Sequence, residues 1–356
     1  MSKISIICPY LSGKGGTETV LSLISSHNKK RLNIEYVLPY KGYDKEWLSN
    51  AIYVDNNRKS KLKLLNKVYA VFFLASYVIK SKSSLYISLS TQFIFLLYIF
   101  RFLFRKNYKI ISWIHFSLHH EKTVKPNKLF MADYHLAISS GIKKQLIDMG
   151  MKEDNIYLIY NPISPQKINN EEIKKTNGNK RFIYVGRITY EGQKNLKELI
   201  TAFSYVRGNW RLSIVGSGSE NDIDKCKFLI NKYGLGENIQ WFGWLKHPWD
   251  EVKDIDALVM SSTYEGFGMV LGEAISRGIY CLAADCPVGP DDIIVEGVNG
   301  NLYKTGDVNK LSSIIQNFID VDDIKDREKI ASTIKKFYIE NYFRAFQDAI
   351  LKIKGY

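Results

Sequence analysis

The sequence predicts an α/β protein made of two doubly wound parallel-sheet domains of similar size. In both halves of the chain, short apolar runs rich in β-branched residues alternate with amphipathic stretches, the pattern of parallel strands joined by helices. The 356 residues are too many for one ordinary core and suit two domains. Between the halves, Asn161–Gly178 leads from NPISPQ into the charged, Asn-rich NNEEIKKTNG, which is the composition of a domain linker. We therefore expect one domain at residues 1–162 and another at 163–337.

In the first half, the expected strands are short runs dominated by Ile, Leu and Val, each followed by polar or turn residues. In chain order they are Lys3–Cys8, Ile34–Leu38, Leu85–Leu89, Lys109–Ile114, His135–Ile138 and Ile156–Ile159. Apolar residues at helical spacing predict helices over Thr17–His27 and Ser140–Met149. The start of the chain, MSKISIICPY, has only a short apolar run and is interpreted as a first strand rather than a signal peptide.

The same alternation restarts after the linker. The expected elements are, in chain order, strand Arg181–Val185, helix Asn195–Tyr205, strand Arg211–Val215, helix Glu220–Lys232, strands Asn238–Phe242 and Ala257–Ser261, helix Met269–Arg277 and strand Tyr280–Ala284. A final helical stretch, about Ser332–Lys354, has no strand after it. We expect this terminal helix, at about 338–356, to pack back onto the first domain.

The most hydrophobic segment is Lys61–Phe104, and three interpretations of it stay open. Its longest uncharged runs are Val68–Ile79 and Ser83–Phe100, and the second contains SLSTQ, which suits a buried strand turning into a helix. That interpretation leaves too few apolar helical residues for an ordinary membrane span. The alternatives are a transmembrane helix, a monotopic helix with lysines and arginines nearby, or plain core.

The positive charge lies in the first half. Residues 1–162 hold 24 Lys and Arg against 10 Asp and Glu, whereas residues 163–356 hold 26 of each kind. Such an excess suits either a solvated basic surface or contact with something anionic, namely phospholipid headgroups, a phosphorylated glycan or nucleic acid. The four cysteines have no metal-ligand spacing, which indicates a reducing compartment and excludes a disulfide scaffold.

Glycine-rich turns follow several predicted strands, where open parallel sheets bind ligands. They are Gly13–Glu18, Gly186–Lys194, Gly216–Gly218 and Gly266–Val270. None fits the P-loop pattern, and no complete dinucleotide fingerprint occurs, so a P-loop nucleotidase and a Rossmann oxidoreductase are disfavoured.

The turns of the second half form the more specific combination. Arg187 and Lys194 lie just after a strand, and Gly266–Val270 presents free amides at a helix start. Two cations with such amides can hold a diphosphate. Glu265 and Glu273 bracket the glycine turn, and a carboxylate can accept hydrogen bonds from the vicinal hydroxyls of a sugar.

These residues resemble the retaining GT-B glycosyltransferases of family 4, also called group 1. The resemblance is carried by GRITYEGQKN (186–195), VGSG (215–218), WFGW (241–244) and SSTYEGFGMVLGEAISRGIYCLAADC (261–286), which contains the family's E-x7-E element. The stretch CPVGPDDIIVEGVNGNLY (286–303) further resembles members that build bacterial lipopolysaccharide cores, capsules and wall polymers. The likeness is strong over about 181–305 and weaker over 1–140. It implies two Rossmann-like domains facing each other across a cleft, the first binding the acceptor and the second the donor.

The resemblance implies catalytic contacts for His115, Arg187, Lys194 and Glu265. The residues implied in donor binding are Gly15, Gly16, Gly186, Arg187, Lys194, Gly216, Trp244, Leu245, Glu265, Gly266, Phe267, Gly268, Met269, Val270 and Glu273. By this likeness Arg187 and Lys194 hold the diphosphate, Glu273 the ribose and Glu265 the hexose. The amides of the glycine turn contact sugar and phosphate, the backbone at Trp244–Leu245 contacts the base, and His115 lies beside the sugar.

Some assignments have open alternatives. The interval from Arg187 to Lys194 is one residue longer than in many members, and His119 or His120 could replace His115 as the polar contact. Glu18 could be no more than a charge at a helix start.

The family mechanism implies departure of the nucleotide from the face that the acceptor attacks, with Glu265 orienting the sugar and not attacking it. Three Asp-x-Asp pairs, at 222–224, 254–256 and 320–322, match a metal motif, as an Asp-rich chain does by chance. With cations and amides available, we expect no metal and no cofactor.

The expected function is transfer of a hexose, from a UDP-sugar by preference, to a glycan, glycolipid or polyanionic wall polymer. We expect a cytoplasmic protein, peripheral on the inner face of the cell membrane and bound to anionic lipid through its basic first half. The alternatives are a sugar phosphorylase or epimerase of the same fold and a basic nucleic-acid-binding protein. The intact set of Arg187, Lys194, Glu265 and Glu273 disfavours nucleic acid as a partner, because a non-catalytic binder has no need of it.

Overall fold

The computed structural model describes residues 3–9, 11, 15–28, 32–41, 45–168, 179–321 and 326–355. The chain divides into two compact units, Met1–Pro162 with Phe337–Tyr356, and Ile163–Lys336. Most of the predicted linker, residues 169–178, lies outside the described residues, and so do Gly13 and Lys14 of the first glycine turn.

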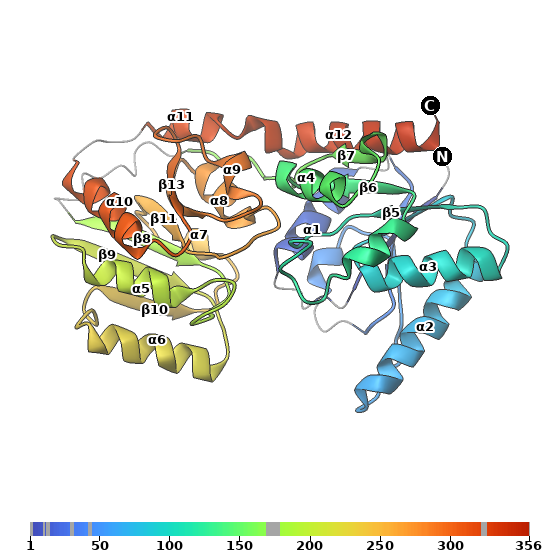
Figure 1. The fold of residues 1–356 in the computed structure, drawn as a ribbon, viewed down its shortest axis with the longest axis horizontal. Coiled ribbons are helices and arrows are strands. Elements are labelled where there is room, and N and C mark those ends of the chain that lie inside the picture. Colours follow the sequence, from blue (N-terminus) through green and yellow to red (C-terminus); the bar gives the residue numbers. More distant parts are fainter. Residues whose placement is uncertain are drawn as a thin grey trace. The chain divides into compact units, whose positions relative to one another are not determined.

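The first unit is built on a seven-stranded parallel sheet with the strand order β3-β2-β1-β4-β5-β6-β7 (Figure 1). Its strands are β1 Ile4–Ile7, β2 Ile34–Leu38, β3 Tyr53–Asp55, β4 Leu85–Ser88, β5 Lys109–Ser112, β6 Tyr134–Ala137 and β7 Ile156–Leu158. Its α-helices are α1 Gly16–Asn28, α2 Lys63–Lys80, α3 Thr91–Leu103, α4 Ser140–Asp148 and α12 Ile339–Lys354. The predicted parallel sheet is confirmed, because every strand pair in it is parallel.

The segment Lys61–Phe104 forms a helix, a strand and a second helix. The strand is β4, which is fully buried between β1 and β5. Ser90 then caps α3, its hydroxyl accepting a hydrogen bond from the Gln92 amide. Of the helices among the described residues, none has the length and hydropathy that a membrane crossing needs.

The second unit is built on a six-stranded parallel sheet with the order β10-β9-β8-β11-β12-β13 (Figure 1). Its strands are β8 Lys180–Val185, β9 Trp210–Val215, β10 Ile239–Gly243, β11 Ala257–Met260, β12 Tyr280–Asp285 and β13 Gly300–Lys304. Its α-helices are α5 Leu196–Ser204, α6 Glu220–Lys232, α7 Pro248–Glu251, α8 Met269–Ile275, α9 Pro290–Ile293, α10 Val308–Asp320 and α11 Arg327–Ser332. The first strand of this unit, β8, lies near the middle of the sheet. The chain adds β9 and β10 on one side of β8 and then crosses to β11 on the other side, so the strand order reverses between β8 and β11.

The helical stretch predicted over about Ser332–Lys354 consists of separate segments, and the helix expected at about 338–356 corresponds to α12, Ile339–Lys354. The stretch contains the end of α11, a 3-10 turn at Lys335–Phe337 and then α12, which starts only at Ile339. The apolar face of α12 packs on the first unit, where Phe346 contacts Trp113 at 6.0 Å between ring centroids and Phe343 contacts His27 at 5.2 Å.

Candidate active site

The candidate site of the second unit lies where its strand order reverses. The turn after β8 carries Arg187 and Lys194, and the turn after β11 carries Glu265 and Gly266–Gly268. Parallel strands place these turns at the same edge of the sheet, and open α/β sheets bind ligands at the carboxyl ends of strands at this point.

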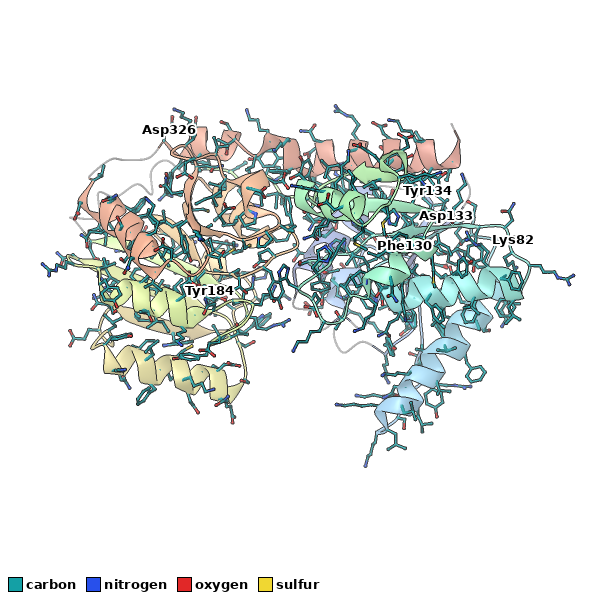
Figure 2. The ribbon with its side chains drawn as sticks, in the orientation of Figure 1. Lys82, Phe130, Asp133, Tyr134, Tyr184 and Asp326 are labelled. Atoms are coloured by element: carbon teal, nitrogen blue, oxygen red, sulfur yellow. The ribbon has the colours of Figure 1, made fainter. Side chains whose placement is uncertain are left out.

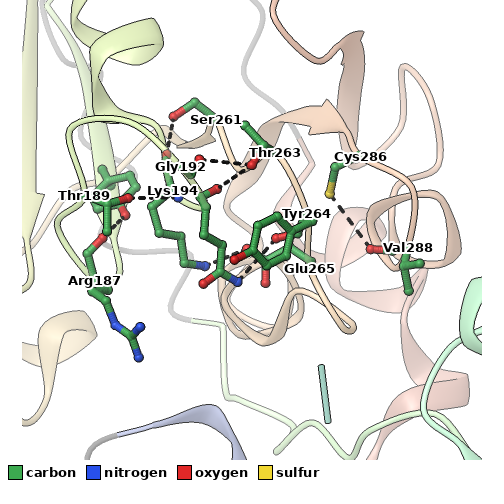
Figure 3. A network of polar contacts seen from close by, with 12 residues as sticks. Arg187, Thr189, Gly192, Lys194, Ser261, Thr263, Tyr264, Glu265, Cys286 and Val288 are labelled. Atoms are coloured by element: carbon green, nitrogen blue, oxygen red, sulfur yellow. Dashed lines mark hydrogen bonds and ion pairs between the residues drawn. The ribbon is translucent and has the colours of Figure 1, made fainter. Parts of the chain in front are cut away.

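A nearly buried ion pair joins the two turns. Lys194 Nζ lies 2.6 Å from Glu265 Oε1, with 16% and 10% of the two side chains exposed (Figure 3). Each charge therefore neutralises the other in a place from which water is largely excluded.

Hydrogen bonds to backbone hold the lysine in this position (Figure 3). The Ser261 hydroxyl donates to the carbonyl of Lys194 at 3.0 Å, and the Lys194 amide donates to the Thr189 hydroxyl at 3.0 Å. The Thr263 amide donates to the Gln193 carbonyl at 2.8 Å. Asn195 takes a left-handed conformation, φ 47°, that turns the chain into α5. The two turns thus form one hydrogen-bonded unit.

Glycines let the β8 turn lie directly against the β9 turn. A Cβ on Gly216 would lie 1.8 Å from the Gly186 carbonyl oxygen, and one on Gly218 would lie 2.1 Å from that of Ile188. The approach is bonded as well, because the Gly186 amide donates to Val215 at 3.0 Å and the Ile188 amide to Ser217 at 2.8 Å. These glycines allow the two backbones to approach closely. The hydrogen bonds of Gly186 and Ile188 also fix the backbone of Arg187, which lies between them in the chain.

The turn before α8 is shaped by Gly268, whose φ of 89° is left-handed. Phe267 is buried beneath it, and Gly289 approaches so closely that a Cβ there would lie 2.4 Å from the Phe267 carbonyl oxygen. Met269 and Val270 form the first positions of α8, so their amides are among those without an intrahelical partner.

Glu273 lies on α8 beside Trp249 and Arg277, neither of which was predicted for the site. Its Oε2 accepts a hydrogen bond of 3.2 Å from Trp249 Nε1, and the Arg277 guanidinium stacks over the Trp249 ring at 5.2 Å. Burial raises the pKa of Glu273, and the Trp249 hydrogen bond and Arg277 charge oppose that rise. Arg277 follows Glu273 by four residues and lies just beyond the end of α8 at Ile275, a proximity that the sequence itself shows. Trp249 is 24 residues away in the chain and carried no such signal.

Arg187 and Trp244 are exposed, unlike the ion pair. The carbonyl of Arg187 accepts a hydrogen bond of 2.7 Å from the buried Tyr184 hydroxyl, which anchors its backbone while the guanidinium faces solvent. Trp244 is 43% exposed, and it and Leu245 follow Gly243, whose carbonyl accepts from the Gly216 amide at 2.7 Å. The predicted base-contacting backbone therefore lies next to the β9 turn.

The first unit carries the remaining predicted residues. Gly15 precedes α1, and a Cβ on it would lie 2.7 Å from the buried Glu18 carboxylate. His115 follows β5 and is 9% exposed, with its ring 4.5 Å from that of Trp113. Its Nε2 has no hydrogen-bond partner among the described residues, and burial lowers its pKa to about 3. His120 differs, because its Nδ1 is bonded to Ser117 at 3.0 Å.

The Asp-x-Asp pairs have structural partners. Asp222 accepts from Ser219 and from the Tyr190 amide, while Arg181 pairs with Asp254 and its amide donates to Asp256. Asp322 of the third pair lies outside the described residues. Among the residues that the structure describes, no group of three or more His, Cys, Asp or Glu could hold a metal ion.

Comparison with known proteins places these features in a family. Residues 165–337 match the family model of the glycosyl transferases group 1. The chain is 34% identical to the lipopolysaccharide 1,6-galactosyltransferase of Escherichia coli K12 and 33% identical to that of Salmonella typhimurium LT2, in each case over 98% of both chains.

Solved structures of glycosyltransferases agree with these sequence matches. The apo form of the lipopolysaccharide outer core galactosyltransferase WaaB is 33% identical, with a TM-score of 0.83 over 98% of this chain and 99% of the other. The Anabaena protein HepE, solved with UDP and glucose, is 18% identical with a TM-score of 0.80 over 98% of this chain and 99% of the other, and shows the shared fold. The full-length identity, the matched family model and the GT-B architecture together show that this chain belongs to the group 1 glycosyltransferases.

Proposed function

We propose that this protein transfers galactose from UDP-galactose to a lipopolysaccharide core, with retention of the anomeric configuration and without a metal. The observation that carries the proposal is the Lys194–Glu265 pair, a cation and a carboxylate held 2.6 Å apart where the strand order reverses. The choice of galactose and of lipopolysaccharide rests on the full-length identity to proteins so named.

The donor would replace the internal partners of the site. Lys194 and the exposed Arg187 supply two positive charges for the diphosphate, and the amides before α8 supply hydrogen bonds to it. When phosphate takes over Lys194, the Glu265 carboxylate becomes available to the hydroxyls of the hexose. Glu273, held by Trp249, is placed to accept from the ribose. For the first unit we propose acceptor binding, with His115, Gly15 and Gly16 as the residues that contact substrate.

The rate would come from positioning and from neutralising the charge of the departing diphosphate. A double displacement needs a carboxylate nucleophile and a separate acid or base. Glu265 is paired with a cation and suits orientation better. We therefore propose that the leaving phosphate oxygen takes the proton of the acceptor hydroxyl as the new glycosidic bond forms on the same face.

We further propose that the protein acts at the inner face of the cytoplasmic membrane. Support comes from the acceptor of the named relatives and from the first 162 residues, with 24 basic against 10 acidic side chains.

A donor panel tests the reaction. The protein is incubated with UDP- and GDP-hexoses and a galactose-deficient lipopolysaccharide, with and without excess chelator, and the product anomer is determined by NMR. We expect an α-linked product from UDP-galactose, unaffected by the chelator. Transfer only from a GDP-sugar would refute the UDP-galactose donor, and loss of activity in chelator would refute the metal-independent reaction. A β-linked product would refute retention of the anomeric configuration. DNA binding with a steep salt dependence and no sugar turnover would favour the nucleic-acid alternative.

The diphosphate assignment has its own test. Because Arg187 is exposed, Arg187→Ala should leave stability unchanged and reduce kcat by about 100- to 1000-fold. Arg207→Ala removes another exposed cation of the same unit and serves as the control. Near-normal activity of Arg187→Ala would show that this residue does not hold the diphosphate.

A further inference from the structure

Helix α2 exposes a stripe of apolar side chains directly opposite its buried face. Its inward side chains are Ala70, Leu74 and Val78, at spacings of four. The outward apolar side chains recur at helical spacing and are Leu65, Val68, Phe72 and Ile79, exposed by 37, 38, 70 and 50%. Figure 1 shows the amino-terminal part of α2 extending away from the sheet of its unit. Nothing described in that unit covers this stripe.

The carboxyl end of α3 continues the same kind of surface. Phe102 and Leu103 are 87% and 65% exposed. They line, with Tyr98, Arg101 and Arg105, a pocket of about 640 Å³. Lys106 Nζ donates to the carbonyl of Ile79 at 2.8 Å and ties the ends of the two helices together. We call the exposed side chains of α2 and of the α3 end the α2–α3 surface.

The two arginines of the pocket differ in their partners. Arg101 donates to Asp133, which is labelled in Figure 2, at 2.6 Å and to the Tyr108 carbonyl at 3.2 Å, and these bonds fix it to the body of the unit. The Arg105 guanidinium is exposed and forms no ion pair with any described residue. An apolar pocket rim with a free cation suits an amphiphile that carries a negative headgroup.

The chain segment that forms this surface carries charge of one sign. From residue 56 to residue 120 the sequence has no Asp and no Glu. The same stretch holds the cations Arg58, Lys59, Lys61, Lys63, Lys67, Lys80, Lys82, Arg101, Arg105, Lys106 and Lys109. A second copy of this surface would bring like charges together, so the surface is complementary to an anionic partner and not to itself.

We propose that the α2–α3 surface docks on an anionic lipid bilayer, with Phe72 and Phe102 entering the headgroup layer and Arg105 binding lipid phosphate. The inference deepens the proposed function, on whose membrane location it rests, by naming the docking residues. Exposed apolar area flanked by lysines and arginines is the chemistry of an interfacial helix. Lysines beside the stripe can keep their charge among the headgroups while their stems lie along the apolar layer.

Vesicle co-sedimentation of the full chain tests the proposal. We expect binding to vesicles of equimolar phosphatidylcholine and phosphatidylglycerol, weakening as salt is added, and far weaker binding to phosphatidylcholine alone. Phe72→Ser combined with Phe102→Ser should weaken binding at least about tenfold. Lys63→Gln combined with Lys67→Gln should weaken it about fivefold for each charge removed.

Helix α6 of the second unit offers matched controls. Phe228 is 71% exposed, close to the 70% of Phe72, and Lys227 is exposed beside it. Phe228→Ser and Lys227→Gln should bind vesicles as the parent protein does. Absence of binding by the parent, equal binding to both vesicle types, or unchanged binding of Phe72→Ser with Phe102→Ser would overturn the proposal. The proposal would also be overturned if the parent protein did not bind vesicles and sedimented as a dimer that this double variant abolishes. The surface would then be a contact between two copies of the chain.

A second readout separates this proposal from the proposed function. UDP-induced thermal stabilisation and transfer to a lipid-free core oligosaccharide should be equal in the parent and all these variants, because none touches the candidate active site. Loss of vesicle binding with this solution activity retained would confirm that the surface acts in docking. A parent protein that binds vesicles but neither binds UDP nor transfers sugar would refute the proposed function and leave the docking assignment supported.

Discussion

His115 shows how burial sets the chemistry of a single residue. Its imidazole lies against Trp113, is 9% exposed and has an Nε2 that no described residue satisfies. Burial penalises the charged form and lowers its pKa to about 3. The ring is therefore neutral at any pH at which the protein would work, and a neutral ring can offer one N–H and one acceptor to a sugar hydroxyl.

The same shift predicts a pH dependence of stability. In the unfolded chain His115 takes up a proton near its ordinary pKa of about 6.5, whereas the folded protein resists protonation until about pH 3. The unfolded state thus binds more protons in this window, and stability falls as the pH drops below about 6.5. Between pH 7 and pH 4.5 the loss from His115 should be about 2 to 3 kcal/mol.

Urea unfolding of the parent and His115→Gln at the two pH values measures this difference. The variant should lose less stability than the parent on acidification. His135, whose pKa burial lowers to about 4, shifts in the same direction and remains in both proteins, so it cancels in the comparison. Equal losses in the two proteins would mean that His115 is protonated in the folded state.

At the scale of elements, the candidate site depends on how closely the turns after β8 and β9 approach. Side chains do not mediate this contact, because backbone meets backbone at Gly186–Gly216 and at Ile188–Gly218. The glycines therefore determine where Arg187 stands relative to the sheet, although none of them needs to touch a ligand.

Gly218→Ala tests this role without the complication of a positive φ. Its Cβ would lie 2.1 Å from the Ile188 carbonyl oxygen, so the turn that carries Arg187 must shift. We expect a loss of about 1 to 3 kcal/mol in unfolding free energy and a weaker UDP affinity, measured by calorimetry. Gly236→Ala is the control, since its Cβ would meet no atom within 4 Å. Equal behaviour of the two variants would contradict the close-approach argument.

At the scale of the whole molecule, the chain returns to its first unit after completing the second. Residues 337–356 belong to the first unit, although 174 residues of the second precede them. Phe346 of α12 is fully buried against Trp113, and Lys109 Nζ donates to the Ile353 carbonyl at 2.5 Å. Residues near the end of the sequence are thus part of the hydrophobic core of the first unit.

Hydrogen exchange measured by mass spectrometry can follow the two units separately. Phe346→Ala should cost about 3 to 5 kcal/mol through the cavity it leaves. We expect it to speed exchange in α1 and β5 while leaving β8 and β11 unchanged. UDP should act on the second unit instead and slow hydrogen exchange over residues 186–195 and 265–273. Faster exchange spread equally over both units, or UDP protection confined to the first, would contradict this division.

Local patterns in the sequence determined most of the elements. The bounds of β2 and α6 agree with the prediction, and the other predicted strands differ by one or two residues. The missed strands both lie at sheet edges: β3 has only three residues and is largely exposed, and β13 has the sequence GNLYK, with few apolar residues. The helical stretch predicted over Ser332–Lys354 is interrupted by the turn at Lys335–Phe337, because the chain passes there from the second unit to the first, and helical spacing does not show such a passage.

For the site, the motifs located Arg187, Lys194, Glu265 and Glu273, and the tertiary structure decided their partners. That Lys194 pairs with Glu265, 71 residues away, and that Trp249 holds Glu273 follows only from strand order and side-chain packing. The physical reason is one of range. Hydrophobic periodicity and turn chemistry act between neighbours in the chain, so they can be recognised in the sequence. The pairing of distant charges depends on which strands lie side by side, and the free energy of the whole unit selects that arrangement.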